Sequence, residues 1–424
     1  MWLRARAFEI IEDVRGSYWF VPALLALAGF LGGLGLVYVD AVVGDAWLGR
    51  FEWFYGSRPE GARALLSTVA GSTITVAGVV FSVTLAAVTY ASGQYGPRLL
   101  SAFTRDRGNQ VTLGVFIGAF LYCLVVLRTI CSAEEASADT AGALREAFVP
   151  HVAMFGALAL AVAAIAVLIY FVHHVTDAIH INNVIARIGH GLIDQIAERR
   201  RDVVAGAGVA PDREHPPTVA GAPVPATRTG YVEAIDEHAL LRLATRHDAL
   251  IQVLAMPGDF VHRGLPVLRV AAADPDHFSA CGELFAIGRQ RSALEDLRFP
   301  IDELVEIAAR ALSPGVNDPF TAIACIDWLC AALIDLARMP QRPAVLRDEE
   351  GIARVVQRRL GLSDFLRAAV GQLAPYAVKD PNAGAHLVRT LETICASLSD
   401  PDQRAQVKAE HDRVARKLAS MRRR

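Results

Sequence analysis

Hydroxyl side chains recur along one apolar stretch of the sequence, about residues 65–91. The hydroxyl set consists of Thr68, Ser72, Thr75, Ser82 and Thr89, and four of its members are seven residues apart. Small residues accompany it: Gly71, Gly78, Ala86, Ser92 and Gly93. In a helix this spacing places the whole set on one face. Such a face can line a hydrated pathway for an ion or small solute, or it can allow close packing between membrane helices.

Ionisable side chains form a second set at the ends of apolar stretches. Arg128 lies near the end of the third stretch, and His173, Asp177 and His180 near the end of the fourth. Spacings of four and seven residues predict that the last three share a helix face. Imidazole and carboxylate groups can hold a metal or a proton, but three ligands without a fourth favour a solvated interfacial cluster. We expect no metal and no cofactor.

A third candidate is the punctuated turn Ser313-Pro314-Gly315-Val316-Asn317-Asp318-Pro319, which precedes a long apolar helix. Asn317 or Asp318 ahead of Pro319 is typical of a helix N-cap. A helix start can also bind an anion. Ser313, Asn317 and Asp318 are therefore either capping residues or a ligand site, with capping the simpler interpretation.

The elements that must position these residues are membrane helices. The chain has 424 residues, 53% of them hydrophobic and 20% charged, and its mean hydropathy is +0.33. The apolar excess lies before residue 180, in stretches long enough to cross a hydrocarbon core of about 30 Å. Four spans are predicted, at about residues 18–39, 65–91, 110–130 and 149–172. We expect an interfacial amphipathic segment at 1–17 and a four-helix transmembrane domain at 18–176.

Arginine positions predict the orientation of these spans. Ten arginines flank the ends assigned to the cytoplasm, and four lie in the two opposite loops. Because arginine is retained on the cytoplasmic side, both termini are expected there, in a bacterial inner membrane.

The remaining chain predicts a cytoplasmic α+β region. A helix and a Pro/Gly/Ala linker occupy 177–228, a small β domain 229–275 and a helical domain 276–424. Strands are predicted at 230–235, 240–244, 250–254 and 266–270. The order and spacing of these strands and their turns are similar to those of the barrel-sandwich fold of lipoyl and biotin carriers. The modified lysine of those carriers has no counterpart here. Helices are predicted at 320–337, 348–372 and 384–397, followed by a basic terminal helix.

Several motifs show a broader resemblance. They are Phe103-Thr104-Arg105-Asp106 with Gln110 and Leu113-Gly114, Val126-Leu127-Arg128, Pro257-Gly258-Asp259-Phe260-Val261, Phe285-Ala286-Ile287-Gly288 with Arg291, and Ala311 to Pro319. The chain resembles the bacterial predicted-membrane-protein family catalogued as domain of unknown function 2254. This resemblance implies an inner-membrane protein and transfers no catalytic residue.

Two functions remain open. The hydroxyl face favours a homo-oligomeric channel or transporter in the lipid bilayer, with the second span lining the pathway and a cytoplasmic regulatory domain. The alternative is a membrane-anchored sensor or scaffold whose cytoplasmic domain binds a ligand or partner. A net charge of −2 argues against a nucleic-acid partner, and the absence of catalytic motifs argues against an enzyme.

Overall fold

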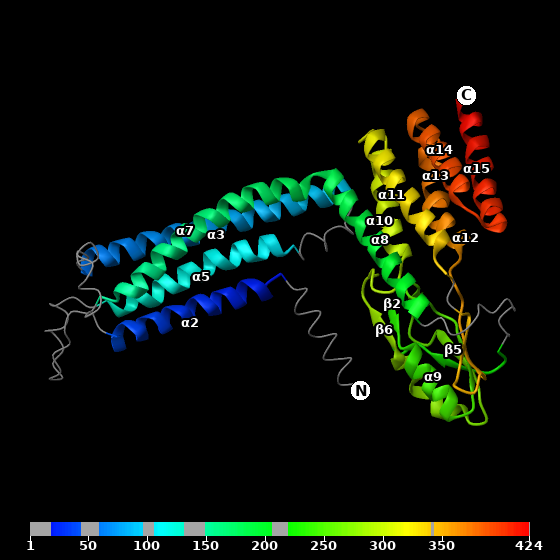
Figure 1. Cartoon of the computed structure of the whole chain (residues 1–424), viewed down its shortest axis with the longest axis horizontal. Coiled ribbons are helices and arrows are strands. Elements are labelled where there is room, and N and C mark those ends of the chain that lie inside the picture. Colours follow the sequence, from blue (N-terminus) through cyan, green and yellow to red (C-terminus); the bar gives the residue numbers. More distant parts are fainter. Residues whose placement is uncertain are drawn as a thin grey trace. The chain divides into compact units, whose positions relative to one another are not determined.

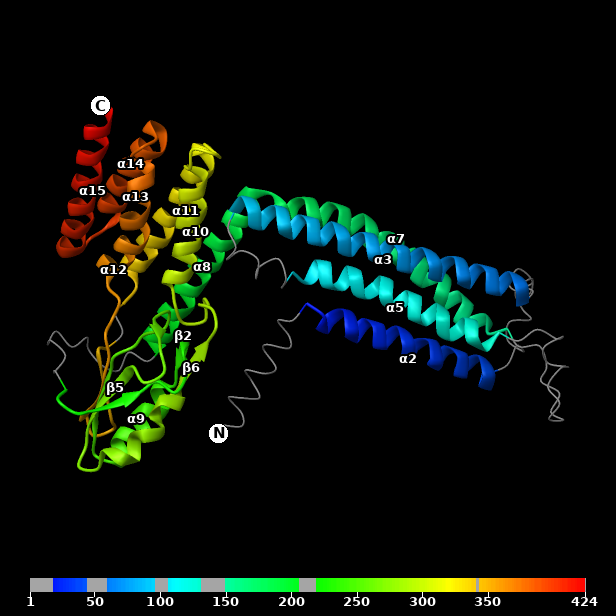
Figure 2. The same cartoon turned by 180° about the vertical axis from the view of Figure 1, so that it is seen from behind.

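A computed structural model describes residues 18–43, 59–95, 106–130, 149–205, 219–340 and 343–423 (Figures 1 and 2). The chain divides into two compact units, unit 1 (Met1–His180) and unit 2 (Ile181–Arg424). The predicted interfacial segment 1–17 and most of the predicted linker lie outside the described residues.

Unit 1 contains a long apolar helix at each of the four predicted spans. The helices are α2 (Phe20–Val43), α3 (Pro59–Tyr95), α5 (Arg107–Thr129) and α7 (His151–Ile179). All four are long and apolar enough to cross a membrane. In both views α5 lies between α2 and the pair formed by α3 and α7, and α5 packs on all three.

The contact between α2 and α5 depends on glycine. A Cβ added at Gly29 would come within 2.2 Å of the carbonyl oxygen of Gly118, and one added at Gly118 would meet the carbonyl oxygen of Leu25 at 2.7 Å. The two backbones therefore touch directly. Such close approach is how membrane helices gain van der Waals contact in the absence of a hydrophobic driving force.

Unit 2 begins with α8 (Ile181–Ala205) and a region of two sheets. The strands are β1 (Ala222–Pro225), β2 (Gly230–Ile235), β3 (Leu250–Val253), β4 (Phe260–Val261), β5 (Pro266–Ala271), β6 (Phe285–Gly288), β7 (Val345–Arg347) and β8 (Ala353–Val356). One sheet has the order β1-β5-β3-β8-β7 and the other β4-β2-β6. A 3₁₀ segment, Pro275–Leu284, precedes β6. The first sheet thus recruits strands from outside residues 229–275.

Two predictions of local structure were wrong. Residues 240–244 belong to the helix α9 (Glu237–Arg246), because Asp236 caps its start by accepting the N–H of Ala239 and because Leu240 and Ala244 bury one helical face. The expected helix at 348–372 is interrupted by β8, which pairs in parallel with β3. A strand partner distant in sequence overrides the local pattern there.

The remaining helices of unit 2 pack on α8 and on one another. They are α10 (Arg298–Ala311), α11 (Pro319–Arg338), α12 (Leu362–Leu366), α13 (Gln372–Ala377), α14 (Pro381–Ser397) and α15 (Pro401–Arg422), with a π turn (Arg367–Gly371) joining α12 to α13. Helix α11 is apolar and long enough to be a fifth candidate span. It packs against α8, α10 and α14, so the core of unit 2 accounts for its apolar residues.

Candidate functional site

The predicted hydroxyl set lies on the outer face of α3. Its members, Thr68, Ser72, Thr75, Ser82 and Thr89, are all exposed. The opposite face of the same helix carries Ala62, Leu66, Ala70, Ala77 and Val80, which are buried against the other helices. The hydroxyl face therefore points away from the core of unit 1.

Four of the five hydroxyl groups of this face are bonded to their own helix. Thr68, Thr75, Ser82 and Thr89 each donate to the carbonyl oxygen four residues earlier, at 2.7 to 2.8 Å. The donor of each group is thereby satisfied within α3, and the oxygen lone pairs remain on the outer surface. The face offers hydrogen-bond acceptors along its length.

The outer faces of α2 and α7 differ in character. Exposed side chains there are large and apolar: Leu24, Leu27, Leu31 and Leu34 on α2, and Leu158, Val162, Ile165 and Ile169 on α7. Such surfaces fit lipid tails. The outer surface of α3 mixes the two kinds of side chain: Val79 is exposed between Thr75 and Ser82, and Ile74, Phe81, Val83, Leu85 and Tyr90 are exposed around the hydroxyl face.

Unit 1 also contains an ionisable pair that the sequence did not predict. The Nε2 atom of His174 on α7 lies 2.8 Å from a carboxylate oxygen of Asp106, and both side chains are largely buried. Asp106 caps α5 by accepting the N–H of Gly108. A Cβ at Gly108 would come within 2.4 Å of His174 Nε2. In the sequence, Asp106 stands out as a carboxylate two residues before a glycine at the start of a span. Its partner, His174, lies 68 residues further along the chain, so local patterns do not identify the pair.

The predicted ionisable cluster is only partly assembled. His173 Nε2 and Asp177 Oδ2 lie 3.4 Å apart, and both side chains are exposed. His180 follows as the C-cap residue of α7, which ends at Ile179. Arg128 is exposed in the last turn of α5. The described residues contain no group of three or more metal-ligating side chains.

The turn before α11 is organised by Asp318. Its carboxylate accepts the N–H groups of Phe320 and Thr321 and the hydroxyl of Thr321. The carbonyl oxygen of Ser313 accepts the N–H of Asn317, which adopts a positive φ of 50°. Capping thus uses the Asp318 carboxylate, and Asn317 serves as a left-handed turn residue.

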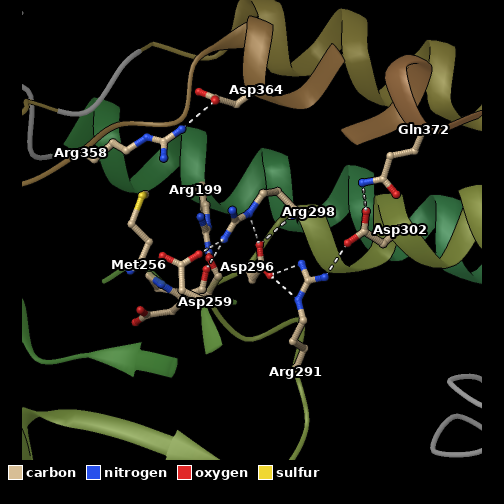
Figure 3. A network of polar contacts seen from close by, with 12 residues as sticks. Arg199, Met256, Asp259, Arg291, Asp296, Arg298, Asp302, Arg358, Asp364 and Gln372 are labelled. Atoms are coloured by element: carbon tan, nitrogen blue, oxygen red, sulfur yellow. Dashed lines mark hydrogen bonds and ion pairs between the residues drawn. The ribbon is translucent and has the colours of Figure 1, made fainter. Parts of the chain in front are cut away.

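Unit 2 contains a buried network of arginine and aspartate (Figure 3). Asp296, only 2% exposed, lies between two guanidinium groups. It accepts Nε of Arg298 at 3.0 Å and Nη2 of Arg291 at 2.5 Å. Arg291 also donates to Asp302 at 2.5 Å. Burial alone would lower the pKa of Arg291, but hydrogen bonds and charge pairing with Asp296 and Asp302 raise it.

This network explains two of the motifs. A Cβ at Gly258, whose φ is +90°, would come within 1.9 Å of Asp296 Oδ2. Arg298 donates to the carbonyl oxygen of Pro257 at 2.7 Å. The Pro257-Gly258-Asp259 turn is therefore bonded to Arg298 at the start of α10, and Arg298 and Arg291 share the Asp296 carboxylate.

A cavity of about 430 Å³ lies beside the network. One face of α8 lines it with Gln195, Glu198, Arg199 and Asp202. Apolar lining comes from the sheets, α11 and α12: Ile235, Val253, Ala255, Leu336, Met339, Leu362 and Phe365. The buried Oε1 atom of Gln195 has no hydrogen-bond partner among the described residues. Its lining suits an organic ligand with an apolar body and a hydrogen-bond donor.

Comparison with known proteins agrees with the membrane character of the chain. A family model described as predicted membrane protein (DUF2254) matches residues 15–393. Two similar proteins are the uncharacterized proteins Mb1321c of Mycobacterium bovis and Rv1290c of Mycobacterium tuberculosis. Each is 30% identical over 423 residues, which cover 97% of this chain and 78% of the relative. No solved structure matches the chain.

Proposed function

The chain belongs to the DUF2254 family of predicted membrane proteins, and from that premise we propose that it is a homo-oligomeric channel or transporter of the bacterial inner membrane. In this proposal copies of α3 surround the pathway and unit 2 regulates it from the cytoplasmic side. The observation that carries the proposal is the hydroxyl face of α3, which points away from the core of its own chain.

The interior of a single copy favours a pathway between copies. Two clusters of buried apolar side chains lie between the four helices of unit 1. One is built around Leu66, Tyr122 and Val126, the other around Val80, Phe116 and Phe171. Polar solutes are disfavoured in such surroundings. The hydroxyl face is the better candidate for a wall of the pathway.

The length of the hydroxyl face matches a membrane. From Thr68 to Thr89 the helix rises by roughly 32 Å at 1.5 Å per residue, which is close to the hydrocarbon thickness of about 30 Å. The seven-residue spacing places a hydroxyl about every 10 Å along this length.

Hydrogen bonding within α3 points to the class of solute. Because Thr68, Thr75, Ser82 and Thr89 donate to their own helix, their oxygen atoms are left as acceptors. Acceptor oxygens can replace water around a cation or bind a solute that donates hydrogen bonds. We therefore propose a small cation, or a small neutral solute rich in donors, in preference to an anion.

Flux measurements test the proposal. Protein reconstituted in liposomes is assayed for potassium, sodium and chloride flux, with Thr75→Leu and Ser82→Leu as test variants. Leucine removes the acceptor and fills the pathway, so we expect cation flux to fall at least tenfold in each variant. Thr176→Leu is the matched control, because Thr176 is exposed on α7 and makes the same bond to its own helix. Equal flux in all three variants would refute the pathway along α3.

The cavity of unit 2 favours a second candidate, a membrane-anchored ligand sensor. Its wall includes α8, which follows the span α7 after a single residue. Native mass spectrometry of the full chain would detect a co-purifying small molecule. Ala255→Phe is expected to fill the cavity and release that molecule, while Ala239→Phe, outside the cavity, leaves it bound. Bound ligand together with an absence of flux would favour the sensor.

A further inference from the structure

Three side chains of α8 bring oxygen acceptors to the cavity of unit 2. They are Gln195, Glu198 and Asp202, which line the cavity and are three and four residues apart, so they share one helix face. The Oε1 atom of Gln195 is buried and unpartnered. In the part of the chain that the structure describes, the carboxylates of Glu198 and Asp202 make no hydrogen bond or ion pair. This acceptor face, defined as Gln195, Glu198 and Asp202, is therefore open to the donors of a ligand.

The floor of the cavity is apolar. Val253 of β3, Leu297 before α10, Leu336 of α11 and both Leu362 and Phe365 of α12 line it and are buried. Such a surface favours a hydrocarbon or aromatic body. The volume of about 430 Å³ lies within the range of roughly 300–1,000 Å³ that is typical of small-molecule sites.

The arginines at the cavity give no excess of positive charge. Arg199 donates to the carbonyl oxygen of Glu295, and Arg358 donates to a carboxylate oxygen of Asp364 at 2.9 Å (Figure 3). Over the whole lining, four Asp and Glu side chains stand against three arginines. An anionic ligand would require the opposite balance, whereas a cation is compatible with this one.

The cavity lies at the carboxyl ends of two parallel strands. Strand β3 ends at Val253 and β8 at Val356, and the two strands pair in parallel. Val253 and Ala255 line the cavity from the first strand and the loop after it, and Gln357 lines it directly after the second. In sheets with parallel strands, these ends are a common position of ligand sites. The position in the fold therefore supports ligand binding independently of the lining.

We propose that the cavity binds an organic amine, with its cationic nitrogen at the acceptor face and its apolar body over the floor. The nitrogen donates to Gln195 Oε1 and pairs with the carboxylate of Glu198, one turn away on α8. Hydrogen bonds between an ammonium group and a carboxylate are stronger than neutral ones. Asp202 lies a further turn along, where it can accept from a second donor. The proposal rests on the second candidate function, the ligand sensor, and names the class of its ligand.

Three ligands with one apolar body test the class. 4-Phenylbutylamine, 4-phenylbutanol and 4-phenylbutyrate share their carbon skeleton and carry a cationic, a neutral and an anionic head group. Each is titrated calorimetrically into the full chain in phosphatidylcholine nanodiscs, with empty nanodiscs as the blank for partition into lipid. We expect the amine to bind about tenfold more tightly than either of the others, because a charge-assisted hydrogen bond is roughly twice as strong as a neutral one.

Variants of the acceptor face locate the amine. Glu198→Gln keeps the shape of the side chain and removes its charge, and Gln195→Leu removes the buried acceptor. We expect each change to weaken binding of 4-phenylbutylamine about fivefold or more. Glu283→Gln is the matched control, because Glu283 is exposed and lies outside the cavity. Melting temperatures of the variants show that each is folded.

The outcomes separate the ligand class from the sensor. Failure of 4-phenylbutylamine to bind, tighter binding of the alcohol or the carboxylate, or equal affinities in Glu198→Gln and Glu283→Gln would overturn the amine. A neutral or anionic molecule that co-purifies with the chain in native mass spectrometry would also overturn it, and the sensor would stand. The sensor itself fails if no molecule co-purifies and none of the three ligands binds.

Discussion

Glycine has opposite surroundings in two regions of unit 1. At Gly29 on α2 a Cβ would meet the carbonyl oxygen of Gly118 at 2.2 Å. At Gly78 on α3 a Cβ would meet no described atom within 4 Å. The first glycine is packed against another helix of the same chain, whereas the second is exposed on the outer face of α3. Glycine thus makes a backbone contact in α2, whereas in α3 it is free to contact another surface.

The difference teaches how a small-residue face should be interpreted in a membrane helix. Lipid tails are as apolar as leucine, so burying leucine between helices gains little, and close backbone contact contributes most. The α2–α5 contact makes this close backbone approach within one copy. The hydroxyl face of α3 makes no such contact within its own chain and is therefore open to a second copy or to water. The proposed function rests on this difference.

The largest expected effect is at the closed contact. Gly29→Val forces side-chain atoms into the backbone of Gly118, and we expect a loss of about 3 kcal/mol in the free energy of unfolding. Gly35→Val is the matched control on the same helix, because a Cβ there would meet no described atom within 4 Å. Denaturant titration of the detergent-solubilised protein measures both. Equal losses of unfolding free energy in the two variants would show that the close contact of Gly29 with Gly118 does not set the cost of the substitution.

A smaller effect is expected for bulk added to the open face. Gly78→Leu should leave the single chain folded but weaken its association at least tenfold, which equals about 1.4 kcal/mol. Oligomer mass in lipid nanodiscs gives the measurement. Ala163→Leu, at an exposed position of α7, should leave the mass unchanged. An unaltered oligomer in Gly78→Leu would remove α3 from the interface.

An intermediate case is Gly108, where the neighbour is the end of a side chain. Gly108→Ala should displace His174 from Asp106 and lower the free energy of unfolding by about 1 kcal/mol. A double-mutant cycle with His174→Ala isolates the cause. If Gly108→Ala costs the same when His174 is already alanine, the pair is not what the glycine accommodates.

The smallest effect is expected for the smallest change on the open face. Gly78→Ala adds one methyl group where space is free and removes the helix penalty of glycine, so stability should rise by up to about 1 kcal/mol. Thermal unfolding in detergent provides the readout. A clear destabilisation would mean that a second copy packs against Gly78 closely enough to exclude a methyl group.

Local sequence patterns predicted the helices and strands better than they predicted which elements pack or pair with one another. The four spans, the capped start of α11 at Asp318 and the strands at 230–235, 250–254 and 266–270 depend on residues close together in the chain, and they correspond to helices and strands of the fold. The strand expected at 240–244 failed because a cap at Asp236 fits a helix equally well. For β8, the deciding partner β3 lies about a hundred residues earlier.

The sequence by itself determined that this is a membrane protein, because runs of about twenty apolar residues match the thickness of the hydrocarbon core and are stable there. It also determined the hydroxyl face of α3, since helical periodicity is a local property. Only the tertiary structure decided that this face points outward, that Gly29 of α2 packs against Gly118 of α5, and that His174 rather than His173 meets Asp106. Each of these depends on which helices become neighbours, and that choice is made by packing between segments distant in the sequence.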